Sequence, residues 1–352
     1  TKTKKMESLF HQRTKDIVLK QHVVEEAKGG IINDSMMYIY EGGCIQLIDR
    51  ENGNVVASHF FKEKINHVEA YTYYSLIKLL IAVGDTIQIM DINTGEIIEY
   101  IESKAFEGKT IHTFVGGMEE NEPDTLRLFV AVNTGELFKV DISLAIVGLT
   151  EQENRSLTLE TTEQERRMED DEGTTPLISQ LETIHVIKNN KEERILTLLF
   201  TPHNQLLFII TSKKQLITIH YQHEMTLESD LSDHFPSNEE STAMIMHSLI
   251  HPKDPERSYI LLADPQLPIL AMYVISYMPT QNSWLFKLLM KQSLGAKRVA
   301  HFVTIDDTIE DEVDTEYIAD LSKVGILYTI PHGVICEVLH LQQYLVDQQL
   351  YK

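Results

Sequence analysis

One stretch of this chain occurs twice, and the two copies lie 42 residues apart, as from Ile45 to Ile87. The earlier copy runs from Gly42 to Val56 and the later one from Gly84 to Ile98. The matching positions are Ile45, Gln46, Asp49 and Gly53 in the first copy and Ile87, Gln88, Asp91 and Gly95 in the second. Each copy reads as a tight turn, a strand with alternating side chains that ends in Asp, a Gly-containing turn and another apolar run.

A repeat of about 40 to 45 residues made of strands and turns is typical of β-propeller blades. Further hairpins downstream have the same form, in which a short polar turn joins two apolar strands. Several of the turns contain Gly, Asn or Asp, which tolerate the positive φ of tight hairpins. The six turns lie at residues 42–43, 84–85, 133–135, 212–214, 264–268 and 331–333. We therefore predict an all-β fold, a single β-propeller domain over residues 1–352 with six or seven four-stranded antiparallel blades.

Three acidic segments interrupt the spacing of the hairpins, and we interpret them as loop insertions. They lie at about residues 150–180, 224–242 and 306–320, and the last carries eight acidic residues and no Lys or Arg. Segments of this composition bury too little apolar surface to offset chain entropy, so we expect mobile loops. They would act as solvated spacers or as docking tails for basic partners.

The two ends of the chain carry weaker patterns. Residues 6–30 contain a short apolar run, Ile17–Leu19, which could supply a strand to the last blade. At residues 339–351 the spacing of Leu341 and Leu345 changes to a helical period and predicts a short amphipathic helix. That helix would either pack on the ring of blades or face a partner.

The charge balance limits the kinds of partner. The chain has 31 Lys and Arg against 53 Asp and Glu, a formal net charge of −22. Such a field repels a phosphate backbone, so we expect no direct nucleic-acid binding and favour basic partners. The apolar runs have the length of strands, and a bilayer requires about 20 apolar residues, so we predict no transmembrane segment.

Compartment is predicted from the cysteines and from the start of the chain. Cys44 and Cys336 are too few for a disulfide scaffold and favour a reducing environment. We expect two buried, inert thiols; the alternative is a bridge that joins the two ends of the ring. The first residues, Thr1–Met6, lead into no apolar core, so no secretory signal is expected. These features predict an intracellular protein, cytoplasmic or nuclear.

The repeated Asp49 and Asp91, with Asp141 in a similar place, resemble the Asp that ends a strand in WD-repeat propellers. The tryptophan that precedes this Asp in that family is absent at all three places, and the chain has 1 Trp in total. The resemblance is therefore to degenerate, WD-like propellers. We expect these carboxylates to accept hydrogen bonds from turn backbone rather than to act as catalytic acids.

The Asp-x-x-x-Gly pattern also looks like the repeat of quinoprotein dehydrogenase propellers. Those enzymes stack a quinone on tryptophan and hold Ca²⁺ nearby. A single Trp and the lack of adjacent cysteines disfavour that enzymatic interpretation.

We find no motif for catalysis or metal binding. His220 and His223 are three residues apart, so on a strand they would point to opposite faces and could not share a metal. His247 and His251 are four apart, but zinc needs three or four converging ligands. The acidic run Asp306–Asp314 lacks the Gly that lets an EF-hand loop turn. We therefore predict no catalytic residues, no metal and no cofactor.

Three stretches in the last third of the chain follow one another in a recognisable order. They are Ser258–Tyr273, then Trp284–Phe302, which contains Leu-Gly, and then Gly325–Leu341, a hairpin that leads into the helix. This order resembles the terminal region of the damaged-DNA-binding and polyadenylation-factor large-subunit family, whose members are far longer. That family builds multi-propeller scaffolds of ubiquitin ligases, splicing complexes and RNA 3′-end complexes, so the resemblance implies a scaffold.

Together these patterns predict a non-enzymatic scaffold for protein–protein interaction, a subunit of a larger intracellular complex whose partners are other protein subunits or peptides. We expect the six hairpin turns to form a partner-binding rim. Its candidate residues are Gly43, Asp85, Asn133, Lys213, Lys214, Asp264 and His332. Two alternatives remain: an enzyme with acidic or His side chains gathered in the central channel, and a membrane-trafficking coat propeller.

Overall fold

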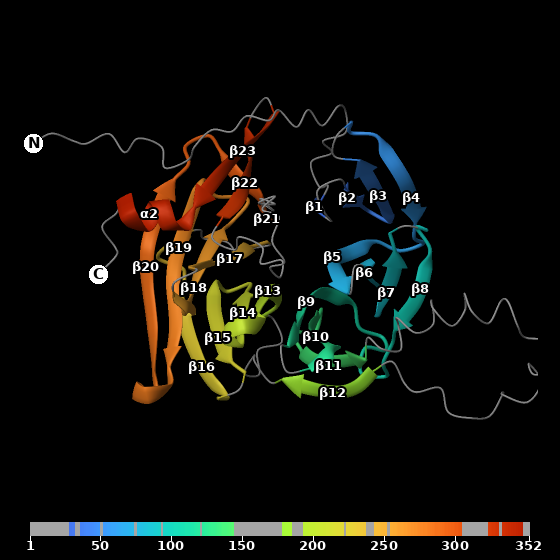
Figure 1. Ribbon diagram of the computed structural model, residues 1–352, viewed down its shortest axis with the longest axis horizontal. Coiled ribbons are helices and arrows are strands. Elements are labelled where there is room, and N and C mark those ends of the chain that lie inside the picture. The colour runs from blue at the N-terminus through green and yellow to red at the C-terminus, as the bar shows by residue number, and fades with distance from the viewer. Residues whose placement is uncertain are drawn as a thin grey trace, which may run out of the picture. The chain divides into compact units, whose positions relative to one another are not determined.

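A computed structural model shows six antiparallel sheets that follow one another along the chain (Figure 1). It describes residues 28–31, 36–49, 52–73, 76–92, 94–119, 122–143, 178–184, 193–221, 223–236, 243–251, 254–304, 323–330 and 333–347, and the statements below concern these residues. Five sheets have four strands and the last has three. Each strand pairs with the next one along the chain, so every sheet is a meander.

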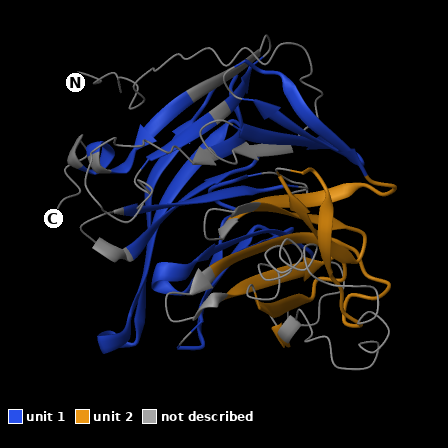
Figure 2. Cartoon of the chain, turned by 45° about the vertical axis from the view of Figure 1, so that its right-hand side comes forward, with its two compact units in different colours: residues 1–60, 193–352 blue, residues 61–192 orange. Residues whose placement is uncertain are grey.

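The sheets divide into two compact units, which Figure 2 colours separately. Unit 2 holds the second and third sheets. The second contains β5 (Ile65–Tyr73), β6 (Leu76–Val83), β7 (Thr86–Asp91) and β8 (Ile97–Ile101). The third contains β9 (Ile111–Glu119), β10 (Glu122–Val132), β11 (Leu137–Ser143) and β12 (Ile178–Ile184).

Unit 1 holds the other four sheets. The first contains β1 (Lys28–Ile31), β2 (Met36–Glu41), β3 (Cys44–Asp49) and β4 (Val55–Phe60). The fourth contains β13 (Ile195–Thr201), β14 (Leu206–Thr211), β15 (Gln215–His220) and β16 (Met225–Asp230). The fifth contains β17 (Ile245–His251), β18 (Asp254–Ala263), β19 (Ile269–Met278) and β20 (Ser283–Ser293). The last contains β21 (Arg298–Thr304), β22 (Lys323–Ile330) and β23 (Gly333–His340) and leads into α2 (Leu341–Asp347).

Within each unit the first strands of neighbouring sheets lie side by side. In unit 1, β13 lies beside β17, β17 beside β21, and β21 beside β1; in unit 2, β5 lies beside β9. The first strand of each sheet is therefore the inner one and the last strand the outer one, which is the blade order of a propeller. The fold is a six-bladed β-propeller, and the predicted all-β propeller of six or seven blades is confirmed.

The core lies between the faces of neighbouring sheets. In unit 2, Phe114 and Leu128 of the third sheet join one apolar cluster with Leu80 and Ile89 of the second. The central strand β19 is buried at every position except its two ends, because the fourth sheet packs on one of its faces and the last sheet packs on the other. Burying one large aliphatic side chain contributes roughly 1.5–3 kcal/mol, so a sheet gains most of its stability from the next blade.

The duplicated stretch folds the same way in both copies. After β3, the Gly53 amide donates to the Asp49 carbonyl (2.8 Å), and after β7 the Gly95 amide donates to the Asp91 carbonyl (2.8 Å). Both glycines have left-handed backbone, with φ of 72° and 70°. Because residues with a Cβ avoid this region, the repeated Gly follows from the repeated turn.

The interpretation of residues 224–242 as an acidic insertion is wrong in its first half. Residues 225–230 form β16, whose side chains alternate between half-buried and exposed, and the turn after it buries Leu231 and Phe235. The acidic residues of this strand lie on its exposed face, which gives the segment the composition of a loop although it forms a strand. Residues 178–180 likewise begin β12. Most of the 150–180 segment and all of 306–320 lie outside the described residues.

The structure describes the two ends of the chain in part. Lys28–Ile31 forms β1 and pairs with β2 in the first blade. Ile17–Leu19, the run expected to supply a strand to the last blade, lies outside the described residues. The helix begins at Leu341 because residues 339–340 still belong to β23. It packs on unit 1, where Leu341 and Leu345 are buried in the cluster formed by the last two sheets.

Cys44 is a free thiol, so the alternative of a bridge to Cys336 is wrong. The thiol is partly buried rather than fully buried, and burial followed by the nearby Glu41 raises its pKa. Among the described residues no helix is long and apolar enough to cross a bilayer.

Two glycines test how tightly the chain packs, both within a blade and against the next one. A Cβ on Gly116 of β9 would lie 2.3 Å from the Arg127 carbonyl oxygen and 2.8 Å from the Tyr71 hydroxyl, whereas one on Gly53 would meet nothing within 4 Å. We expect Gly116→Ala to lower the free energy of unfolding by about 3 kcal/mol and Gly53→Ala by about 1 kcal/mol, through its positive φ alone. Urea unfolding measures both, and equal losses would contradict the packing argument.

Candidate functional site

Every predicted rim residue that the structure describes lies in the connection between the second and third strands of its sheet. Asn133 and Lys213 are exposed at the tips of their turns, whereas Gly43 and Asp85 are half-buried. Asn133 is held in place, because its amide donates to the Thr110 carbonyl (2.8 Å) and its side-chain oxygen accepts from the Thr110 amide (3.1 Å). His332 lies outside the described residues.

Two of the predicted rim residues are buried and have partners within the chain. Lys214 is 4% exposed with φ of 61°, and its ammonium donates to the Phe235 carbonyl (3.0 Å). Asp264 is 3% exposed, and its carboxylate accepts from the Gln266 amide (2.9 Å). Asp264 shapes its own turn, whereas the Lys214 side chain is bound to the turn that follows β16. The basic turn therefore presents one ammonium, that of Lys213. The sequence placed Lys214 in a turn correctly but could not show that the turn after β16 covers it.

Two of these hairpins, in the second and third sheets, carry a buried ion pair at the end away from the turn. The sequence analysis did not predict these pairs. Lys78 of β6 lies across from Asp91 of β7, with 2.6 Å between Nζ and Oδ2, and both side chains are less than 10% exposed. In the next blade Arg127 takes the corresponding place and donates two hydrogen bonds to Asp141, at 2.8 and 3.1 Å. In the first blade Met36 lies across from Asp49. A basic residue 13 or 14 positions before the repeated Asp was the available signal.

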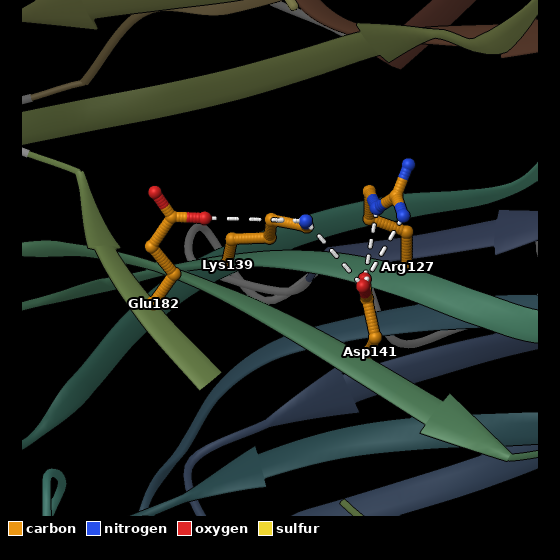
Figure 3. A network of polar contacts seen from close by, with 4 residues as sticks. All are labelled: Arg127, Lys139, Asp141 and Glu182. Carbon is orange, nitrogen blue, oxygen red and sulfur yellow. Dashed lines mark hydrogen bonds and ion pairs between the residues drawn. The ribbon is translucent and has the colours of Figure 1, made fainter. Parts of the chain in front are cut away.

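Figure 3 shows that the Asp141 carboxylate lies between two cations. The Lys139 ammonium is 3.4 Å from Asp141 Oδ2 and 4.0 Å from a Glu182 carboxylate oxygen. Arg127, Lys139 and Asp141 are each less than 10% exposed, whereas Glu182 is 59% exposed. A buried ion pair adds little over an apolar pair, but loss of one partner costs about 3–5 kcal/mol. The network therefore fixes the register of β10 against β11.

The expected role of the repeated Asp residues as acceptors for turn backbone is confirmed in two blades. Asp49 accepts from the Asn52 amide (3.3 Å), and Asp91 accepts from the Thr94 amide (3.2 Å). The bonds between Asp141 and Arg127 add a second role, because the carboxylate also binds a cation on the neighbouring strand.

The inner strands of unit 2 gather polar side chains. Tyr71 donates to Glu69 (3.0 Å), another oxygen of Glu69 is 3.6 Å from His67 Nε2, and His67 Nδ1 is 3.4 Å from the Thr113 hydroxyl. Burial, followed by the charge of Glu69, raises the Tyr71 pKa well above its usual value. The enzymatic alternative predicts acidic or His side chains in the central channel, and this inner-strand cluster, packed between β5 and β9, is the observation that bears on it. Among the described residues, no three His, Cys, Asp or Glu are placed to hold a metal.

The expectation that His220 and His223 point to opposite faces is wrong. Their ring centroids are 4.5 Å apart, and the Tyr277 ring lies 5.0 and 5.3 Å from them. The strand rule does not apply because β15 ends at His220, and the turn that follows carries His223 back over the first ring. Burial, then the charge of His223, lowers the His220 pKa.

The sequence matches no protein-family model, and it also matches no curated protein. Solved structures are similar in fold. The structure described as BBS1N in complex with ARL6DN has a TM-score of 0.51 at 11% identity and covers 87% of this chain and 75% of its own. The Swd1 (Cps50) β-propeller domain of Myceliophteria thermophila has a TM-score of 0.51 at 9% identity and covers 88% of this chain and 81% of its own. At these identities the likeness shows the fold alone: this chain is a propeller similar to WD-like propellers.

The two adjacent lysines should respond very differently to charge reversal. We expect Lys214→Glu to lower the free energy of unfolding by about 3 kcal/mol or more, because it places a carboxylate beside the Phe235 carbonyl in a buried turn. Lys213→Glu is expected to change it by less than about 0.5 kcal/mol, because the side chain is exposed. Thermal and urea unfolding of the single variants measure this difference, and a stable Lys214→Glu protein would contradict the burial of Lys214.

Stability should also depend on pH through His247 of β17. Burial, followed by the charge of His301, lowers the pKa of His247 from 6.5 to about 4. The unfolded chain therefore binds a proton at His247 more readily than the folded chain does. The stabilising contribution of neutral His247 to the free energy of unfolding is complete above about pH 6.5 and is lost as the pH falls towards 4. The loss amounts to about 3 kcal/mol, at 1.36 kcal/mol per pKa unit.

Urea unfolding between pH 4 and 7 checks this expectation. His247→Leu should flatten the dependence in that window, whereas His203→Gln, at an exposed position, should leave it unchanged. An equally steep dependence in His247→Leu would show that another group is responsible.

Proposed function

We propose that this chain is a non-enzymatic scaffold for protein–protein interaction and works as a subunit of a larger intracellular assembly. The observation that carries the proposal is the construction of the exposed turns. Lys213 is exposed while its neighbours Ser212 and Lys214 are buried, and Asn133 is exposed while bonded to Thr110. Such turns hold polar groups at fixed positions, which lowers the ordering cost of docking a partner.

The comparisons support this class of function. The similar propeller BBS1N was solved bound to another protein, ARL6DN. The stretches that resemble the damaged-DNA-binding and polyadenylation-factor family fall on β18 to α2, which form consecutive blades and the helix that packs on them. That family consists of scaffold subunits, and the same role is proposed here.

The charge of the chain indicates the chemistry of its partners. At −22 the chain attracts basic surfaces and repels phosphate backbones. We therefore propose protein subunits or peptides with basic docking surfaces as partners and no direct contact with nucleic acid. The exposed ammonium of Lys213 adds one site for an acidic group.

The enzymatic alternative has one observation in its favour, the inner-strand cluster of Tyr71, Glu69, His67 and Thr113. A carboxylate between a tyrosine and an imidazole can move a proton. One variant distinguishes the two functions. Glu69→Gln would abolish turnover if the cluster were an active site, whereas a scaffold with this change would still bind its partners.

Affinity capture from the cells that make the protein tests the scaffold. The tagged wild-type chain should elute ahead of a monomer on size exclusion, with a reproducible set of proteins identified by mass spectrometry. Lys213→Glu should lose one or more of them, because it reverses the charge at an exposed turn. Lys287→Glu makes the same change on the exposed face of β20 and should retain them all. A wild-type chain recovered only as a monomer would contradict the scaffold.

A further inference from the structure

The exposed apolar side chains of the described residues concentrate on one strand. Four large ones are clearly exposed: Val55 (51%), Val56 (59%), Phe60 (75%) and Tyr100 (49%). The first three belong to β4, the outer strand of the first blade. Single exposed apolar residues are ordinary, but three on one six-residue strand form a patch.

β4 is also an edge. It pairs with β3 on one side, and within the described residues no strand lies on the other. An edge strand presents a row of backbone N–H and C=O groups that another strand can pair with, and proteins usually protect such edges with charged side chains.

The other outer strands carry that protection, and β4 does not. The charged residues of the other outer strands are Glu99 in β8, Glu182 in β12, Glu228 and Asp230 in β16, Lys287 and Lys291 in β20, and Glu337 in β23. The sequence of β4, Val-Val-Ala-Ser-His-Phe, contains no Asp, Glu, Lys or Arg. Among the described outer strands, β4 is therefore the one that lacks the charged side chains that oppose strand addition.

The geometry of β4 determines what can occupy the edge. Val56, Ser58 and Phe60 are all exposed and, two residues apart, lie on one face of the strand. A strand added beside β4 would place alternate side chains next to Val56 and Phe60, where apolar pairs are stabilising. The occupant is therefore an extended segment with apolar residues at alternate positions.

Charge and size argue against a second copy of this chain as the occupant. Two chains of net charge −22 repel each other. A six-residue edge also falls short of the roughly 1,200 Å² that a stable protein interface buries. The chain-wide charge instead attracts a positively charged segment.

We propose that β4 is a strand-addition site for an extended segment of a partner protein, net positive and with apolar side chains at alternate positions. The proposal deepens the scaffold function and rests on it. Main-chain hydrogen bonds to β4 would supply affinity, and the contacts with Val56 and Phe60 would supply specificity.

A peptide-binding experiment on the full chain tests the proposal. The probe is a fluorescent nonapeptide in which Lys and Val alternate, titrated with wild-type protein and followed by fluorescence anisotropy. We expect saturable binding, and hydrogen exchange of the amides of Val55–Phe60 should slow when the peptide is bound. Val56→Ser/Phe60→Ser keeps the net charge and should weaken binding at least about tenfold, which is about 1.4 kcal/mol.

Matched controls separate strand addition from general attraction. Tyr100→Ser removes the exposed aromatic side chain of β8 and should leave binding unchanged. A peptide with N-methyl groups on alternate residues cannot complete the hydrogen-bond ladder, and one with Glu in place of Lys lacks the positive charge; neither should bind. Circular dichroism and thermal unfolding establish that the variants are folded.

Three results would overturn the proposal. They are equal binding of the N-methylated peptide, equal binding of the Glu peptide, and wild-type dimers whose β4 amides are protected without any peptide. If binding to β4 fails while affinity capture still recovers partners that depend on Lys213, the scaffold stands without this site. If capture also recovers only a monomer, the scaffold itself has failed.

Discussion

Each blade of this propeller is a small sheet with two apolar faces, and neither face can stay in water. Ile269–Met278 is buried at every position except its two ends, which is possible only because a neighbouring blade lies against each face of that sheet. The fit is close enough that β9 has Gly116 where a Cβ would lie 2.8 Å from the Tyr71 hydroxyl of the neighbouring blade. Loss of packing between blades would therefore expose the central strands of both.

Buried ion pairs add a second constraint, on register. Lys78 with Asp91 and Arg127 with Asp141 each join the second strand to the third at the end away from the hairpin turn. Because a shift by one residue would leave a buried charge without its partner, the pairs favour one alignment of the strands. These two hairpins are therefore fixed at both ends, by a turn at one and by an ion pair at the other. This rigidity suits surfaces that bind by presenting a preformed shape.

The candidate surfaces differ in how they arise. Lys213 and Asn133 are exposed because a turn must pass over the end of a buried hairpin, so they are features that any propeller blade could offer. β4 is different, because an outer strand can be protected by a single charge and every other described outer strand has one. The lack of charge on β4 is thus a property of this sequence rather than of the fold.

The sequence by itself determined the repeat, and the repeat determined the fold class. A period of about 42 residues with a recurring Asp and Gly predicts a repeated unit of a strand and a turn, in which the turn needs a residue with left-handed backbone. Both copies form this unit. The hairpins were predictable because their signals are local. The alternating pattern of β16 was equally local, but its acidic residues concealed it.

Only the tertiary structure decided which side chains are accessible and which charges meet. Lys213 and Lys214 are adjacent and chemically identical, yet one is exposed and the other is buried under the turn around Phe235. His220 and His223 come together because a turn interrupts the strand. Burial and pairing depend on segments that are distant in sequence or on the exact path of a turn, and neither is encoded in the residue types at the site.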